Sequence, residues 1–256
     1  MISIYDWFGY ELPIGERYKL IKEAGFDGVL LWWSEDFGRG YYRYGPQIAR
    51  EAGLFIENIH APIQNQHDLW LDNLNGEALT DCYLKCIEDC ANFEIPTMVV
   101  HLPDEDHLHN ALGLDRIKRI ADRAEQLNVN VALENLWNLT NLAYMLEQVE
   151  SLRMGFCYDS GHHYRYYPDK DFLSLYGSRL MAVHLHDDNG SYAQHGLPFD
   201  GTLDWSTIMR KIAEVNYSGP TAIEAMNWDY KNLTTKQFLH EAYKRAKRLE
   251  ALCKTE

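Results

Sequence analysis

Four short apolar segments of this 256-residue chain each end in an acid or a histidine. Their last residues are Glu134, Asp159, His184 and Glu224. An apolar run of this length is typical of a buried parallel strand. If the four strands belong to one barrel, three carboxylates and one imidazole meet at the C-terminal ends of the strands. Burying several carboxylates together is costly unless a cation neutralises them, so the pattern predicts a metal site.

Histidines follow other predicted strand ends or lie in the loops beyond them. These are His60, His101, His162, His186 and His195. One such histidine alone is more often a packing residue than a ligand, but six consecutive strand ends with a polar residue are hard to explain by packing. Mixed oxygen and nitrogen ligands suit one divalent ion, and Mn²⁺, Mg²⁺, Co²⁺ and Zn²⁺ all fit. The pattern offers no thiolate that would select zinc.

Short β-like runs alternate with amphipathic helical stretches along the chain. Strands are predicted at 2–5, 29–32, 54–60, 97–101, 129–134, 154–159, 180–184 and 221–224. Helices are predicted at 16–24, 77–93, 114–127, 141–150, 169–176, 205–215 and 235–252, and a further helix is predicted to end just before Gly53. Eight strands in this alternation favour an α/β fold, a single (β/α)₈ TIM barrel domain over residues 1–256. The alternative is an open doubly wound sheet, but no Gly-rich phosphate turn follows the first strand.

Composition limits the partners. The formal net charge of -14 opposes nucleic-acid binding, which usually depends on a basic surface. The chain contains no run of about 18 apolar residues, so a membrane span is not expected. Its first residues are typical of a strand and not of a signal peptide. The five cysteines suggest no disulfide framework and hence a reducing compartment. We therefore expect a cytoplasmic protein with a small-molecule substrate, and the sequence leaves a homo-oligomer open.

Several motifs, in their order and spacing, resemble the xylose isomerase-like barrels. The matching segments are Ile59-His60-Ala61-Pro62, Val100-His101, Leu133-Glu134-Asn135, Asp159-Ser160-Gly161-His162, Val183-His184-Leu185-His186-Asp187, residues 198–205 and Ile223-Glu224. That family includes sugar isomerases, ketose 3-epimerases, hydroxypyruvate isomerases, dehydratases of inosose and dehydroshikimate, and zinc-dependent apurinic-site endonucleases. The resemblance implies that Glu134, Asp159, His184 and Glu224 hold the shared metal. His186 is the competing ligand from the same strand, two residues beyond His184.

The resemblance implies a metal-dependent isomerase or epimerase of a sugar or sugar-like polyol. Such an enzyme removes a proton next to a carbonyl, and a divalent ion stabilises the charge of the resulting enediolate. Glu134 and Glu224 are the expected catalytic residues, acting from opposite sides of the substrate. The expected substrate contacts are His60, His101, His162, His186, His195, Trp7 and Trp32.

Aromatic rings beyond the strand ends suit a sugar pocket, because sugar C–H faces stack on them. Trp7 and Trp32 follow the first and second predicted strands. The alternative is that these large side chains simply wall the mouth of the barrel. Residues 37–44, rich in Tyr and Arg, are predicted to form a long loop that covers the site or packs on its rim.

Three alternatives compete with isomerisation. A dehydratase starts with the same proton removal. A zinc-dependent phosphodiester hydrolase would use several of the histidines, but the family's Asp-x-His reads Ala193-Gln194-His195 here, so a carboxylate ligand of a third metal is missing. The acidic charge also opposes DNA binding. A barrel that binds a sugar or metal without turnover is the third alternative, which the complete set of predicted metal ligands disfavours.

Overall fold

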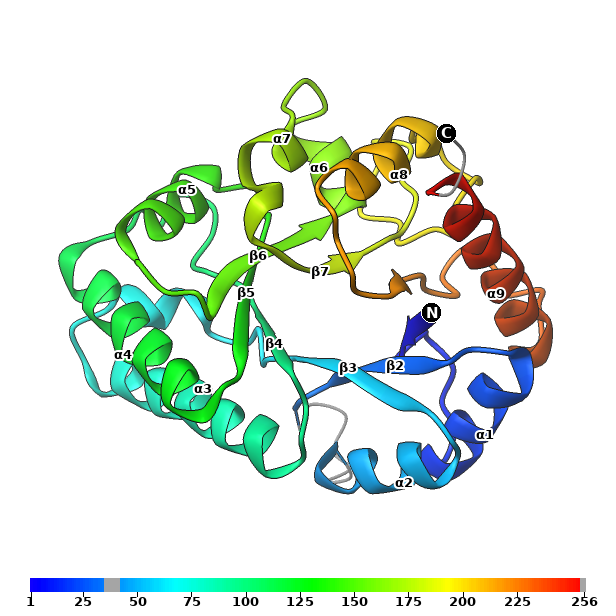
Figure 1. Cartoon of the computed structure of the whole chain (residues 1–256), viewed down its shortest axis with the longest axis horizontal. Coiled ribbons are helices and arrows are strands. Elements are labelled where there is room, and N and C mark those ends of the chain that lie inside the picture. Colours follow the sequence, from blue (N-terminus) through cyan, green and yellow to red (C-terminus); the bar gives the residue numbers. More distant parts are fainter. Residues whose placement is uncertain (35–41, 254–256) are drawn as a thin grey trace.

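The computed structural model describes residues 1–34 and 42–253, and within them eight parallel strands form a barrel (Figure 1). The strands are β1 (Ile2–Tyr5), β2 (Gly28–Trp32), β3 (Phe55–His60), β4 (Thr97–Val100), β5 (Asn130–Glu134), β6 (Met154–Asp159), β7 (Leu180–His184) and β8 (Thr221–Ile223). Each predicted strand agrees with the structure to within one residue at either end. The apolar runs identify the strands well because almost all of their residues are buried.

The order of the strands shows how the barrel closes. The sheet runs β7-β6-β5-β4-β3-β2-β1-β8, so β7 and β8 are its two edges. They are joined just beyond β7, where the N–H of Leu185 donates to the carbonyl of Ala222 at 2.9 Å and the N–H of Glu224 donates to the carbonyl of Leu185 at 3.1 Å. The predicted TIM barrel is confirmed, and the open doubly wound sheet is excluded.

Helices surround the barrel (Figure 1). Their bounds are α1 (Ile14–Ala24), α2 (Gly45–Glu51), α3 (Leu74–Asn92), α4 (Ala111–Leu127), α5 (Leu139–Gln148), α6 (Ser160–Tyr166), α7 (Phe172–Tyr176), α8 (Trp205–Glu214) and α9 (Thr235–Leu252), with short 3₁₀ turns η1 (Tyr42–Tyr44), η2 (Gln66–Trp70) and η3 (Gly177–Arg179). Side-chain caps begin several helices. Asn110, for example, accepts the N–H of Gly113 at 2.7 Å. Gly25 ends α1 in the left-handed conformation, with φ 110°.

Two details differ from the sequence-based expectations. The predicted helix 169–176 begins only at Phe172, and α6 is not predicted at all. Its seven residues carry no apolar stripe, and Asp159 caps it by accepting the N–H of His162. Cys82, Cys86 and Cys90 all lie on α3, where Cys86 and Cys90 are buried and Cys82 is partly buried. Most of the predicted loop 37–44 lies outside the described residues.

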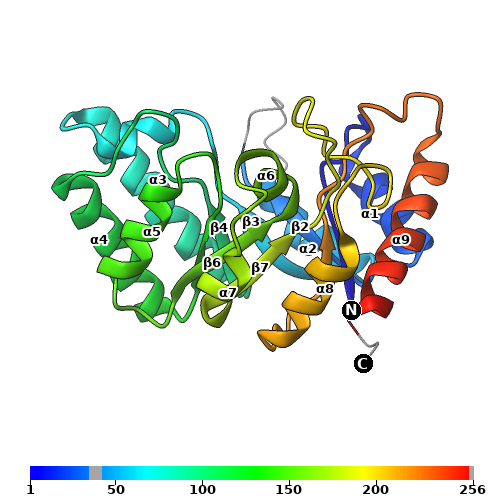
Figure 2. The same ribbon diagram turned by 90° about the horizontal axis from the view of Figure 1, so that it is seen from above.

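The strands all point the same way, so their C-terminal ends share one side of the molecule. Figure 2 shows α6 and the loop after β7 on the upper side and the N-terminus on the lower side. The upper side is therefore the side on which a barrel of this kind builds its site. No helix in the described part of the chain is long and apolar enough to cross a membrane.

Candidate metal centre

Four strand-end side chains converge at the upper opening of the barrel. Glu134, Asp159 and His184 end β5, β6 and β7, and Glu224 directly follows β8. One ligand atom of each residue lies within 4.8 Å of the corresponding atoms of the other three. All four are buried, with at most 6 % of the residue exposed. The parallel arrangement thus brings together residues that are separated by up to ninety positions in the sequence.

His184 lies between the two glutamates. Its Nδ1 is 3.0 Å from Oε2 of Glu134 and 2.8 Å from Oε2 of Glu224. The strand order explains this position, because Glu224 follows β8 at the place where β8 is joined to the segment after β7. His184, and not the competing His186, belongs to the group of four.

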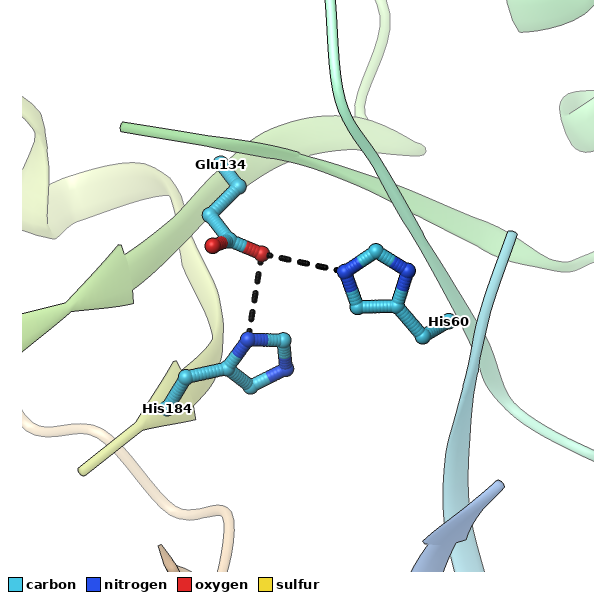
Figure 3. A group of neighbouring side chains, drawn as sticks. All are labelled: His60, Glu134 and His184. Carbon is cyan, nitrogen blue, oxygen red and sulfur yellow. Dashed lines mark ion pairs between the residues drawn. The ribbon is translucent and has the colours of Figure 1, made fainter. Parts of the chain in front are cut away.

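Glu134 is surrounded by further histidines. His101 Nε2 lies 3.3 Å and His162 Nδ1 lies 3.1 Å from Oε1 of Glu134. On the other oxygen, His60 Nε2 lies 3.6 Å from Oε2. Figure 3 shows the side chains of His60 and His184 directed at the same oxygen of Glu134. His60, Glu134 and His184 thus form a second close group of ligand atoms.

Asp159 is held in place by a network of hydrogen bonds. Its Oδ1 accepts the backbone N–H of His162 at 2.6 Å, and its Oδ2 lies 3.0 Å from Nε2 of His186. Its backbone N–H and carbonyl are bound by the side chain of Asn135, at 2.8 and 2.9 Å. The carboxylate therefore has a fixed direction, as a metal ligand requires.

The ring of His186 depends on a glycine. A Cβ on Gly161 would lie 1.9 Å from Cε1 of His186, so any larger residue would displace the ring. On its other side, His186 stacks on His195 with ring centroids 4.0 Å apart. His195 in turn donates through Nδ1 to the carbonyl of Glu224 at 3.2 Å. The structure therefore brings both predicted histidines next to the group of four.

Unpartnered polar atoms test whether the group fits a cation. Among the described residues, Nδ1 of His184, Oε2 of Glu134 and Oε2 of Glu224 are buried and lie close together, but none of them makes a hydrogen bond of good geometry; Nε2 of His184 has no hydrogen-bond partner either. Buried polar atoms are almost always paired, so such a cluster needs an explanation. One divalent ion would bind Nδ1 of His184 and the two carboxylate oxygens that lie beside it. Three carboxylates and one imidazole suit Mn²⁺, Mg²⁺, Co²⁺ or Zn²⁺.

The charges of the group are mutually dependent. Burial alone raises the pKa of Glu134, but His101 and His184 outweigh it and hold the pKa well below the ordinary value. Burial opposes ionisation of Glu224 in the same way, yet His184 lowers its pKa to about 2. The pKa of His184 itself is raised, because Cys157, Glu224 and Glu134 together outweigh the effect of burial. The raised pKa of His184 therefore favours a proton on this ring beside the two carboxylates.

The two predicted tryptophans lie in different surroundings. The ring of Trp32 lies 5.3 Å from the ring of His60, so it borders the group of four. The guanidinium carbon of Arg17 lies over the ring of Trp7, 5.2 Å from the centroid of that ring. Their contacts with a substrate stay a prediction, as do the functional roles of the acids and histidines.

Sequence reasoning missed several supporting residues. Asn135 and Ser160 stand inside the quoted motifs but were assigned no role. Ser160 Oγ donates to the carbonyl of His186 at 2.8 Å and so fixes the loop that carries this ring. Asp187 accepts the indole N–H of Trp205 at 2.7 Å and holds the segment after β7. Asn135 and Ser160 each directly follow a strand-end ligand, and this position is the signal that could have identified them.

Comparison with known proteins agrees with this architecture. The model of the family described as "Xylose isomerase-like TIM barrel" matches residues 18–248. An uncharacterised protein of Sinorhizobium fredii, y4fM, is 29 % identical over 98 % of this chain and 94 % of its own. A structure of D-psicose 3-epimerase with D-tagatose from Clostridium cellulolyticum H10 covers 98 % of this chain and 99 % of its own, with 15 % identity and a TM-score of 0.79.

A further similar structure is that of 3-keto-D-glucoside 4-epimerase, YcjR, from E. coli. It covers 98 % of both chains, with 16 % identity and a TM-score of 0.73. At such low identity these likenesses establish the shared fold and not a shared reaction. The family match, by contrast, spans most of the chain. This protein therefore belongs to the xylose isomerase-like TIM barrel family.

Proposed function

We propose that this protein is a metal-dependent isomerase or epimerase that acts on a sugar or sugar-like polyol. The observation that carries the proposal is the convergence of two buried glutamates, one from β5 and one from the residue after β8, on the same nitrogen of a buried imidazole. Glu134 and Glu224 both lie within 3.0 Å of His184 at the mouth of the barrel. Two carboxylates so arranged can reach a bound carbon centre from two directions.

The first chemical step is the removal of a proton next to the substrate carbonyl. Glu134 and Glu224 are the candidate bases, because both carboxylates lie at the group of four, and their depressed pKa values keep them ionised at neutral pH. One glutamate takes the proton and returns it to the neighbouring carbon, or the other glutamate, after it has taken up a proton from solvent, delivers that proton to the opposite face of the same carbon. The first outcome is isomerisation and the second is epimerisation. His162, 3.1 Å from Glu134, orients this carboxylate.

The group of four also supplies the ligands for a cation. Glu134, Asp159, His184 and Glu224 would hold a divalent ion, which when bound stabilises the negative charge that develops on the substrate oxygens. The protein contributes the burial that strengthens this electrostatic effect and excludes water from the site. The family membership and the similarity to the two epimerase structures support a sugar-like substrate.

Replacing Glu224 tests the proposal. We expect Glu224→Gln to retain part of its metal and to lose exchange of the substrate's α-proton with solvent, because the amide keeps an oxygen ligand but cannot accept the proton. The measurement is NMR of ketoses such as D-tagatose incubated with the enzyme in deuterated water. Glu214→Gln, at the exposed end of α8, is the matched control and should exchange normally. Normal exchange in Glu224→Gln would remove Glu224 from the mechanism.

Two other reaction classes start from the same centre. A dehydratase of the inosose or dehydroshikimate type would also exchange the α-proton, but its product has lost water, which mass spectrometry detects. A zinc-dependent phosphodiester hydrolase is favoured by the second ligand group of His60, Glu134 and His184. It would require two or three ions at this centre, and anomalous diffraction from metal-soaked crystals counts them.

A further inference from the structure

A separate group of three side chains that could bind a metal lies away from the mouth of the barrel. His67 is in η2, after β3, and Glu105 and His107 are in the segment between β4 and α4. One ligand atom of each lies within 4.8 Å of the others. The group shares no residue with the candidate metal centre. Figure 2 shows the cyan segment after β3 on the upper side of the molecule, above α3.

The two imidazole rings lie close together, face to face. The rings of His67 and His107 are stacked, with centroids 3.9 Å apart and planes inclined by 26°. His107 Nδ1 lies 3.0 Å from the carbonyl of Asp104. A carbonyl only accepts, so Nδ1 is the nitrogen that carries the proton, and Nε2 of the neutral ring keeps its lone pair. Metal-binding histidines commonly donate their other ring N–H to a backbone carbonyl in this way.

The segment that carries the group is firmly anchored. The carbonyl of His107 accepts the indole N–H of Trp70 at 3.1 Å and the amide of Asn141 at 2.8 Å. Asn138 donates to the carbonyl of Glu105 at 2.8 Å. These bonds hold the backbone at Glu105 and His107, so less backbone freedom is lost when their side chains bind a cation.

Glu105 has an unusual backbone conformation. Its φ is 53°, in the left-handed region that residues with a Cβ seldom adopt. Such conformations tend to occur where a side chain is held for a function. Here the conformation places the carboxylate beside the two exposed or partly buried imidazoles of His67 and His107.

We propose that His67, Glu105 and His107 form a second metal site, which binds Zn²⁺. Two imidazole nitrogens and one carboxylate suit zinc and disfavour the oxygen-seeking ions Mg²⁺ and Ca²⁺. Three protein ligands leave a fourth position open to water on the exposed side. Binding replaces the weak 3.4 Å contact between the Asp104 N–H and Nδ1 of His67. The ion links the segments that follow β3 and β4.

Zinc binding by the metal-stripped full-length protein tests this site. The protein is dialysed against one fixed concentration of free Zn²⁺, and the bound metal is measured by elemental analysis. We expect His67→Gln and His107→Gln each to bind one zinc ion fewer per chain than the unaltered protein. His240→Gln, which changes an exposed histidine of α9, is the matched control and should bind as much as the unaltered protein.

A further variant separates this site from the barrel mouth. Glu134→Gln alters the candidate metal centre, and combining it with His107→Gln should remove one additional zinc ion. Glu105→Gln, which keeps the size of the side chain, serves if a histidine variant folds poorly. The proposal is overturned if His67→Gln, His107→Gln and Glu105→Gln all bind as much zinc as His240→Gln. It is also overturned if the double variant loses no more than Glu134→Gln alone.

Discussion

At the scale of single residues, Glu57 is a buried acid on β3 that lies outside the candidate metal centre. It is 7 % exposed, and burial raises its pKa from 4.5 to about 8, although the hydroxyl of Ser3, which donates to it, acts in the opposite direction. The folded protein therefore keeps a proton that the unfolded chain loses above its ordinary pKa. The contribution of Glu57 to stability therefore falls as the pH rises from about 4.5 to about 8.

Replacing Glu57 by glutamine should remove this pH dependence. A neutral amide pays no penalty for ionisation, and each unit of pKa shift corresponds to about 1.4 kcal/mol. We expect Glu57→Gln to lose less stability than the unaltered protein between pH 5 and pH 8. Urea unfolding of chelator-treated protein measures it. Glu147→Gln, on the exposed face of α5, is the control. Equal slopes for both variants would show that Glu57 does not carry the effect.

His184 should make metal binding depend on pH. The raised pKa of its ring means that a proton must leave before the nitrogen can bind a cation. We expect the affinity for Mn²⁺ to rise between pH 5 and pH 8, with release of at least one proton per ion. Calorimetric titrations in buffers of different protonation enthalpy count the protons. An affinity that does not change with pH would contradict a His184 ligand.

The sequence identifies ligand positions better than it identifies their neighbours. Glu134 and Asp159 could be found because each ends a continuous apolar run. Glu57 could not, because the register between β2 and β3 shifts at this point and alternation no longer tells which way a side chain faces. The group of His67, Glu105 and His107 was missed because loop geometry, and not a strand end, brings its members together.

At the scale of elements, α6 and the end of β7 depend on Gly161. We expect Gly161→Ala to displace His186, which contacts Asp159, and so to weaken metal binding. Such overpacking costs about 1–3 kcal/mol of stability. Gly15→Ala in α1 is the control, because its Cβ would meet only Ile48, at 3.9 Å. Thermal unfolding and Mn²⁺ titration measure the two variants. Normal metal binding by Gly161→Ala would show that the ring of His186 is not needed.

Element type was predictable where burial is one-sided or complete. Helix α9 has the bounds that were predicted. Its N-terminus carries a capping box of Thr234 and Gln237, and its buried residues recur every three to four positions. Helix α6 was not, because its position is set by the cap at Asp159 and by packing on neighbouring loops, which a local pattern does not contain.

At the scale of the whole molecule, the repeat of strands and helices was sufficient to predict the barrel. Eight buried runs in alternation with helices leave few topologies, since parallel crossovers are right-handed and sequential strands pair. The sequence does not show how firmly the ring of strands is closed. That property depends on β8, which has only three residues, and on two backbone hydrogen bonds to Leu185.

The small number of hydrogen bonds between the segment after β7 and β8 has a consequence for the proposed catalyst. The same N–H group that completes the ring belongs to Glu224, so a local opening between β7 and β8 would swing a ligand away from His184. We expect the amides of Leu185 and Glu224 to exchange with deuterium sooner than those of β5, and Mn²⁺ to slow them selectively. Uniform protection around the ring would refute this. If β7 and β8 do separate first, warming should release the cation, and with it the activity, before the barrel unfolds.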